Sequence, residues 1–173
     1  MTTKIGHDTT GQDIPLSHQN VHDHVRASLD NLGVELIDLL LYHCDDPARP
    51  VTQLADTLVS LVEAGHVRHV GVSNWRAERL TSLAHELAER GHTLVASHQF
   101  SLAEPNPTLL DSLHADATVL GVVRQHRLPL LGWSAQARGF FAHTWTEGTC
   151  RRRASCAGRP TPGGGHLRGA GTR

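Results

Sequence analysis

Polar residues that suit carbonyl chemistry follow a series of short apolar runs in this sequence. The residues at these positions are Lys4, His43, Ser73, Asn74, Gln99, Trp133 and Ser134. A lysine and a histidine can polarise a carbonyl group or tune a neighbouring acid. Serine, asparagine and glutamine can hold an amide group such as a nicotinamide carboxamide, and an aromatic side chain can stack on its ring. The set as a whole is therefore a candidate site.

Taken one at a time, these residues have ordinary structural explanations. Lys4 fits a charged terminus, His43 a satisfied loop histidine, and Ser73 with Asn74 the N-cap of a helix. Polar residues are common in loops, so no single member indicates a function. Their recurrence at successive strand ends favours a shared site.

These side chains need strands to position them. The strand around which the others are organised is the apolar run at 35–43, which ends abruptly in polar residues. The run is too short for a typical helix and is rich in branched side chains, which indicates a buried parallel strand. A histidine at the carboxyl end of such a strand lies where open α/β sheets and barrels carry their chemistry.

Similar units occupy most of the chain. Ser17 is a suitable N-cap for a helix that ends at Gly33, and later helices are expected to carry their apolar stripes at helical spacing. The predicted strands are 2–6, 35–43, 67–72, 94–97 and 128–133. The predicted helices are 17–33, the segment from Pro50 to Gly65, 76–90 and 108–127, the last with an interruption near 114–117.

Alternation of strands with amphipathic helices predicts an α/β fold with a parallel sheet. No G-x-G-x-x-G motif opens any of the helices, so a dinucleotide-binding Rossmann fold has no local support. A (β/α)₈ TIM-type barrel is the better prediction, although a full barrel typically needs ~250 residues. The 173 residues here show about five strands, so the barrel is expected to be incomplete.

Composition excludes several classes of protein. The formal net charge of −1 gives no reason to expect a nucleic-acid partner. The N-terminus lacks the apolar core of a signal peptide, and no run approaches the ~20 apolar residues of a membrane span, so a cytoplasmic protein is expected. The three cysteines and 14 histidines are scattered without ligand spacing. We therefore expect no metal site and ordinary surface histidines.

The apolar period stops after about Phe141. Residues 142–173 are rich in arginine, glycine and proline, and they contain Cys150 and Cys156. Such a segment buries too little apolar surface to offset its ordering entropy. The predicted organisation is a partial barrel at 1–141 and a disordered tail at 142–173.

Five segments of the chain resemble the aldo-keto reductase family. They are 3–6 (TKIG), 28–33 (SLDNLG), 36–43 (LIDLLLYH), 61–75 (LVEAGHVRHVGVSNW) and 132–140 (GWSAQARGF). The resemblance covers roughly residues 2–141, and the order of the LLLYH and GVSN motifs is specific. It implies a (β/α)₈ barrel that reduces aldehydes or ketones, small-molecule carbonyl substrates, with NADPH (NADP).

The resemblance also implies a role for each site residue. Lys4 matches the lysine that lowers the pKa of a catalytic tyrosine, and His43 matches the histidine that orients the carbonyl. The residues implied in cofactor binding are Ser73, Asn74, Gln99, Trp133, Ser134 and Arg138. Trp133 takes the place of the aromatic residue that stacks on the nicotinamide, and Ser134 and Arg138 lie in the segment that approaches the cofactor phosphates.

Two departures from the family pattern limit the expected activity. The catalytic tyrosine and its aspartate partner precede the lysine in the family, but only three residues precede Lys4 here. The only tyrosine is Tyr42, beside His43, and nothing after Phe141 resembles the family's adenosine-phosphate segment. The chain is expected to be truncated at both ends, with weak or no reductase activity, and to self-associate through unpaired edge strands.

Two further hypotheses remain open at the level of the sequence. One is a non-catalytic barrel fragment that binds a nucleotide or a protein partner. The other is a different barrel enzyme, a lyase or isomerase that uses Lys4 as a Schiff-base amine. The order of the motifs argues against the second.

Overall fold

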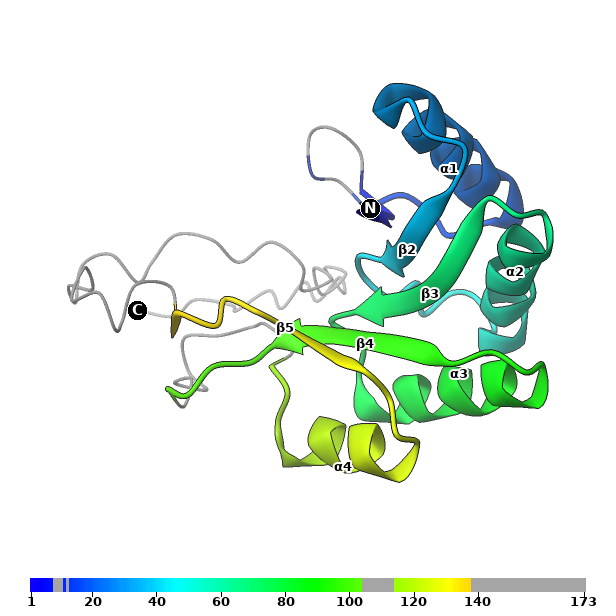
Figure 1. The fold of residues 1–173 in the computed structure, drawn as a ribbon. Helices are drawn as coiled ribbons and strands as arrows, with labels where there is room; N and C mark the ends of the chain where they lie inside the picture. Colours follow the sequence, from blue (N-terminus) through cyan, green and yellow to red (C-terminus); the bar gives the residue numbers. More distant parts are fainter. Residues whose placement is uncertain (8–10, 12, 104–113, 138–173) are drawn as a thin grey trace, which may run out of the picture.

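A computed structural model describes residues 1–7, 11, 13–103 and 114–137, where strands and helices alternate along the chain (Figure 1). The strands are β1 (Thr2–Ile5), β2 (Ile37–Tyr42), β3 (Val67–Ser73), β4 (Leu94–Gln99) and β5 (Leu130–Trp133). The helices are α1 (His18–Leu32), α2 (Val51–Glu63), α3 (Ala77–Glu89) and α4 (Ala117–Gln125). The predicted tail at 142–173, its boundary at 141, and Arg138 lie outside the described residues.

The five strands form one parallel sheet in the order β1-β2-β3-β4-β5. The four helices lie on one side of this sheet (Figure 1). In a doubly wound sheet the strand order reverses and helices cover both faces, whereas a barrel keeps sequential order with all helices outside. The architecture is therefore that of a partial (β/α)₈ barrel, which confirms the predicted fold class.

The hydrophobic core fills the space between the sheet and the helices. Alternate strand residues such as Leu40, Val70 and Ala96 are fully or almost fully buried there. They meet the apolar faces of the helices, represented by Leu58 of α2 and Leu83 of α3, both fully buried. The helices thus adopt their positions because each has one apolar stripe to bury against the sheet.

The ends of α1 follow the predicted signals. Ser17 Oγ accepts a hydrogen bond from Asn20 N at 3.2 Å, and Gly33 ends the helix with φ +64°. Both features satisfy backbone groups that a helix terminus leaves unpaired.

The last helix that the structure describes begins at the predicted interruption. The structure starts α4 at Ala117, where Asp116 Oδ1 accepts from Val119 N at 2.8 Å. His114 instead forms an isolated parallel bridge with Gln99. The predicted break near 114–117 is thus confirmed at 114–116, whereas the helical stretch predicted to begin at 108 lies outside the described part of the chain. None of the helices that the structure describes is both long enough and apolar enough to cross a lipid bilayer.

Candidate functional site at the carboxyl ends of the strands

The sheet has a second face that none of the four helices covers, and Lys4 and Leu41 lie on it. Their neighbours Ile5 and Tyr42 belong to the helix-side core, and successive strand residues point to opposite faces. Lys4 pairs with Leu41 in the register between β1 and β2. His43 follows Tyr42, so the alternation carries it to the uncovered face at the end of β2.

Ser73 and Gln99 reach the same face from the next two strands. A Cβ added at Gly71 would lie 2.6 Å from Leu41 Cδ2 and 2.4 Å from Val95 O, which places Gly71 opposite the helices. Ser73 lies two residues further along β3, beside Ser97 in the register with β4. Gln99, at the end of β4, pairs with Trp133 at the end of β5. The carboxyl ends of β2 to β5 therefore lie at one edge of the sheet with His43, Ser73, Gln99 and Trp133.

Asn74 ties three of these strand ends together. Its backbone is left-handed, with φ +64°, which asparagine tolerates better than most residues. The backbone N–H donates to Ser97 O at 3.1 Å, and side-chain Nδ2 donates to His43 O at 3.2 Å. The position of His43 is thus coupled to β3 and β4 through one side chain.

Two buried oxygen atoms at this edge have no hydrogen-bond partner within the described residues, as is also true of the Trp133 ring nitrogen Nε1. The two oxygens are Ser73 Oγ, in a residue that is fully buried, and Asn74 Oδ1, in a residue that is 8% exposed. Native proteins satisfy nearly all buried polar groups, so such a pair needs an explanation. One atom can donate or accept and the other accepts, which suits a ligand that carries both functions.

His43 is held as a neutral imidazole. Partial burial lowers its pKa to about 4 from the usual 6.5, and the electrostatic influence of the neighbouring His7 and Lys4 acts in the same direction. The His7 and His43 rings meet edge to face with centroids 4.3 Å apart. Near neutral pH the ring can therefore donate one hydrogen bond without carrying a charge.

This shift predicts that acid destabilises the fold. Because the folded-state pKa of His43 lies below the unfolded value, the unfolded chain takes up the proton first, and stability falls as pH drops from about 6.5 to about 4. The pKa values of His98 and His22 are lowered in the same direction, mainly by burial. We expect His43→Gln to remove roughly 1–2 kcal/mol of this pH dependence after allowance for solvent screening.

Thermal melts between neutral pH and pH 4 measure the effect. His85→Gln, a change at an exposed position, is the matched control and should leave the pH slope unchanged. A His43→Gln variant whose stability depends on pH as steeply as that of the parent would contradict the lowered pKa of His43.

The last strand contributes Trp133, which is half-buried and whose carbonyl accepts from Phe100 N at 3.2 Å. Ser134 follows it in a left-handed conformation, with φ +53°, and its carbonyl accepts from Ala137 N at 2.8 Å. Lys4 is exposed, at the opposite end of the row of strands. Arg138, the last of the predicted site residues, lies beyond the described ones.

Tyr42, the one tyrosine of the chain, lies on the helix side of the sheet. It is fully buried, and its hydroxyl donates a long hydrogen bond of 3.5 Å to Leu54 O in α2. Burial raises the pKa of this phenol well above its usual value. The side chain therefore cannot serve the opposite face.

An arginine that sequence reasoning missed holds the loop after β2. Arg79 Nε donates to Asp45 Oδ2 at 2.6 Å, and its second nitrogen donates to Asp46 O and Arg49 O at 3.2 and 3.1 Å. The guanidinium also lies 5.4 Å from the ring centre of Trp75. These contacts come from α3, so only the tertiary structure shows that they fix the segment after His43.

Comparison with known proteins agrees with this architecture. The model of the aldo/keto reductase family matches residues 1–155 of the 173. The chain belongs to the aldo/keto reductase family. The resemblance found in its motifs is thereby confirmed.

The relatives of this aldo/keto reductase chain are longer than it is. It is 30% identical over 136 residues to the oxidoreductase YdhF of Escherichia coli, which covers 78% of the chain and 40% of the relative. It is 25% identical over 164 residues to the aldo-keto reductase yakc [NADP(+)] of Schizosaccharomyces pombe, covering 89% and 46%. A shorter match of 61 residues, covering 34% and 21%, is 43% identical to the aldo-keto reductase Rv2971 of Mycobacterium tuberculosis. The chain spans less than half the length of these relatives.

Proposed function

We propose that this chain binds the nicotinamide end of NADPH at the carboxyl ends of β2 to β5, and that it takes part in the reduction of small aldehydes or ketones. The observation that carries the proposal is the pair of unpartnered buried atoms, Ser73 Oγ and Asn74 Oδ1, next to the neutral His43. Family membership and the NADP(+) named for the yeast relative support it.

The unpartnered atoms complement a carboxamide. A carboxamide has an oxygen that accepts and an NH₂ that donates, so the Ser73 hydroxyl can donate to the oxygen while Asn74 Oδ1 accepts from the NH₂. Gln99 offers a further amide at the next strand end, and Trp133, its register partner, offers an aromatic face. Ser134 and Arg138 follow Trp133 in the sequence and would serve the phosphates of the cofactor.

The residues on this face can orient a carbonyl better than they can protonate it. NADPH supplies a hydride, and negative charge then develops on the carbonyl oxygen. The neutral His43 ring can donate a hydrogen bond to that oxygen, and the Lys4 cation adds favourable charge. Complete reduction also needs a proton, and Tyr42 is buried on the other side of the sheet. We therefore propose weak or no turnover by this chain itself.

The edges of the sheet support a proposal about association. Within the described part of the chain, β1 and β5 each pair with one neighbour only. Unpaired strand edges favour pairing with another chain. We propose self-association through these edges, which makes thermal melts depend on protein concentration.

Thermal melts with and without saturating NADPH test the proposed function. A ligand that binds only the folded state must raise its stability, so we expect a cooperative transition that NADPH shifts upward. A parallel assay with small aldehydes should show NADPH oxidation no faster than in a protein-free blank. If NADPH leaves the melting transition unchanged, the proposed binding site is refuted. If the chain clearly turns over aldehydes, the proposal of weak or no activity is refuted.

The variant Ser73→Ala separates binding from folding. Removal of the unpartnered hydroxyl should leave the free energy of unfolding unchanged or raise it by up to about 1 kcal/mol, since a buried unsatisfied group is lost. The dissociation constant for NADPH should rise roughly five- to ten-fold, as expected for one lost hydrogen bond. Fluorescence titration and urea unfolding give the two values.

The matched control is Ser82→Ala on α3, where the exposed hydroxyl donates to Glu78 O at 3.0 Å. It should change neither value appreciably. If Ser73→Ala bound NADPH as tightly as the parent, the Ser73 hydroxyl would have no part in the proposed site.

A further inference from the structure

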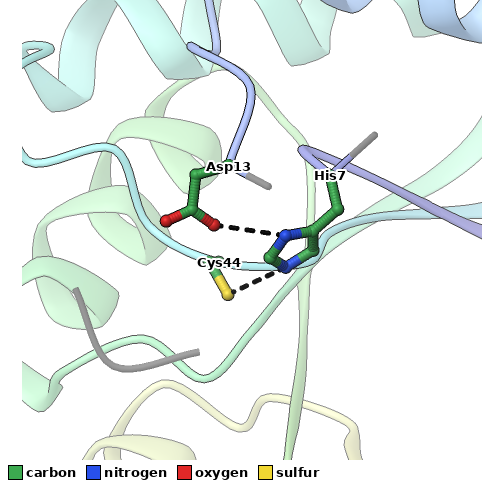
Figure 2. A group of neighbouring side chains, drawn as sticks. All are labelled: His7, Asp13 and Cys44. Atoms are coloured by element: carbon green, nitrogen blue, oxygen red, sulfur yellow. Dashed lines mark hydrogen bonds and ion pairs between the residues drawn. The ribbon is translucent and has the colours of Figure 1, made fainter. Parts of the chain in front are cut away.

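Three side chains from separate parts of the chain meet beside the candidate site. His7 follows β1, Asp13 lies in the next loop, and Cys44 follows His43 at the end of β2 (Figure 2). Cys44 Sγ lies 3.3 Å from His7 Nε2, and Asp13 Oδ1 lies 3.2 Å from His7 Nδ1. The thiol and the carboxylate therefore contact different nitrogens of one imidazole.

The backbone holds this arrangement in place. His7 and Asp13 form an isolated antiparallel bridge, and Ile14 N donates to Gly6 O at 2.9 Å, so the loop closes with the two side chains together. On the other side, His43 N donates to Ile5 O at 2.8 Å, which fixes the segment that leads into Cys44. The grouping is thus anchored at both ends by main-chain contacts.

The order of the contacts favours a proton relay over a metal site. The potential ligand atoms of the three residues all lie within 4.8 Å of one another, which a metal ion could use. A metal would take one nitrogen of His7, so either the thiol or the carboxylate would have to leave its present partner. A carboxylate, an imidazole and a thiol in line are instead the arrangement in which a base, oriented by a third group, activates a nucleophile.

We propose that Cys44 is a nucleophilic thiol and a site of covalent modification by Michael acceptors such as maleimides and enals. His7 Nε2 takes the thiol proton, and Asp13 stabilises the imidazolium through Nδ1. The sulfur forms a C–S bond to the β-carbon, and the electron pair of the C=C bond moves to the α-carbon. That carbon takes the proton back from His7, so the addition needs no oxidant and releases nothing.

The surroundings of the thiol fit this role. Cys44 is partly exposed, so a reagent can reach it, while the His7 side chain is only 14% exposed. Thiolates are the reactive form of cysteine, and an adjacent cationic imidazole favours them. The edge-to-face contact between the His7 and His43 rings joins this cluster to the proposed carbonyl site. The reactivity proposed for Cys44 does not depend on NADPH binding.

Limited labelling with N-ethylmaleimide tests the proposal on the full chain. Mass spectrometry of the peptides compares Cys44 with Cys150 and Cys156, which serve as reference thiols in the same molecule. We expect Cys44 to react about ten-fold faster near neutral pH, as for thiols with an ion-paired imidazole, and all three to react alike in concentrated urea. Equal rates in the native protein would overturn the proposal.

Variants assign the roles of the two partners. His7→Gln should reduce the rate at Cys44 to that of the reference thiols, whereas His69→Gln, at an exposed position, should not. Asp13 is a positioning residue with a side chain that is 68% exposed, so the Asp13→Asn variant should fold normally. It should lower the labelling rate of Cys44 about three-fold, and Asp13→Glu should restore that rate.

Two results count against the relay. A rate at Cys44 that is unchanged in both His7→Gln and Asp13→Asn would show that neither residue activates the thiol. Protection of Cys44 in the purified protein that is lifted by a chelator and restored by Zn²⁺ would identify a metal site in its place.

Discussion

Replacing Gly71 with alanine is expected to lower the free energy of unfolding by about 3 kcal/mol, the upper part of the range for overpacked interiors. The added Cβ would lie 2.4 Å from Val95 O and 2.6 Å from Leu41 Cδ2. One of these atoms belongs to the backbone of β4, so side-chain rotation alone cannot relieve the contact. The pairing of β3 with β4 would have to open at the level of the site.

Urea unfolding of Gly71→Ala measures this cost. Gly121→Ala is the control, because Gly121 lies within α4 with open space around its Cα. Alanine there should stabilise the chain by up to about 1 kcal/mol, since glycine is a poor helix former. A Gly71→Ala variant as stable as the parent would show that β3 and β4 do not approach as closely as described.

Replacing Asn74 with leucine is expected to cost about 3 kcal/mol of stability and to abolish measurable NADPH binding. Leucine at φ +64° is strained by about 1 kcal/mol relative to asparagine, and the partly buried His43 carbonyl loses its donor at a cost of about 1–3 kcal/mol. The change also removes Oδ1, one of the two atoms proposed to bind the carboxamide.

Asn74→Gly separates these effects. Glycine accepts a positive φ without strain, so this variant should recover part of the stability lost in Asn74→Leu. It still lacks the side chain, so its NADPH affinity should remain at least ten-fold below that of the parent, the equivalent of one good hydrogen bond. If Asn74→Gly bound NADPH as the parent does, the Asn74 side chain would have no part in cofactor binding.

The elements of the fold were predictable because each is encoded locally. The spacing of Val21, Val25 and Leu29 predicts a helix, and Ser17 and Gly33 mark its ends, as the structure confirms. The alternation of such helices with apolar runs is sufficient to predict a parallel sheet. The sequence also predicts that Lys4, His43 and Gln99 lie at one edge of the sheet, because the carboxyl ends of parallel strands meet at the same edge.

The errors arose where the local pattern is weak. The predicted strand at 94–97 continues to Gln99, and pleating then turns His98 into the helix-side core, where Nε2 contacts Trp75 O at 2.9 Å. His98 is fully buried, so the expectation that the histidines are surface residues is wrong for it. Hydropathy alone gives no reason to bury an imidazole, because only the hydrogen bond offsets its desolvation.

The cluster of His7, Asp13 and Cys44 could not be predicted either. His7 and Cys44 are 37 residues apart, and each lies just beyond a strand, where loop geometry decides the contact. The same holds for Arg79, whose contacts with the loop after β2 depend on how α3 packs. Interactions between loops and distant helices depend on the assembled fold, and the spacing of apolar residues in the sequence does not predict them.

The sequential strand order has a consequence for folding. Within the described residues, each strand pairs only with its neighbours in the sequence, and each pairing closes a loop in which one helix is described. The entropic cost of loop closure is therefore divided among similar small steps, and no single long-range contact has to form before the others. Such a chain behaves as a short row of nearly equivalent modules, in which order can start at the β2–β3 pair and spread outward in both directions.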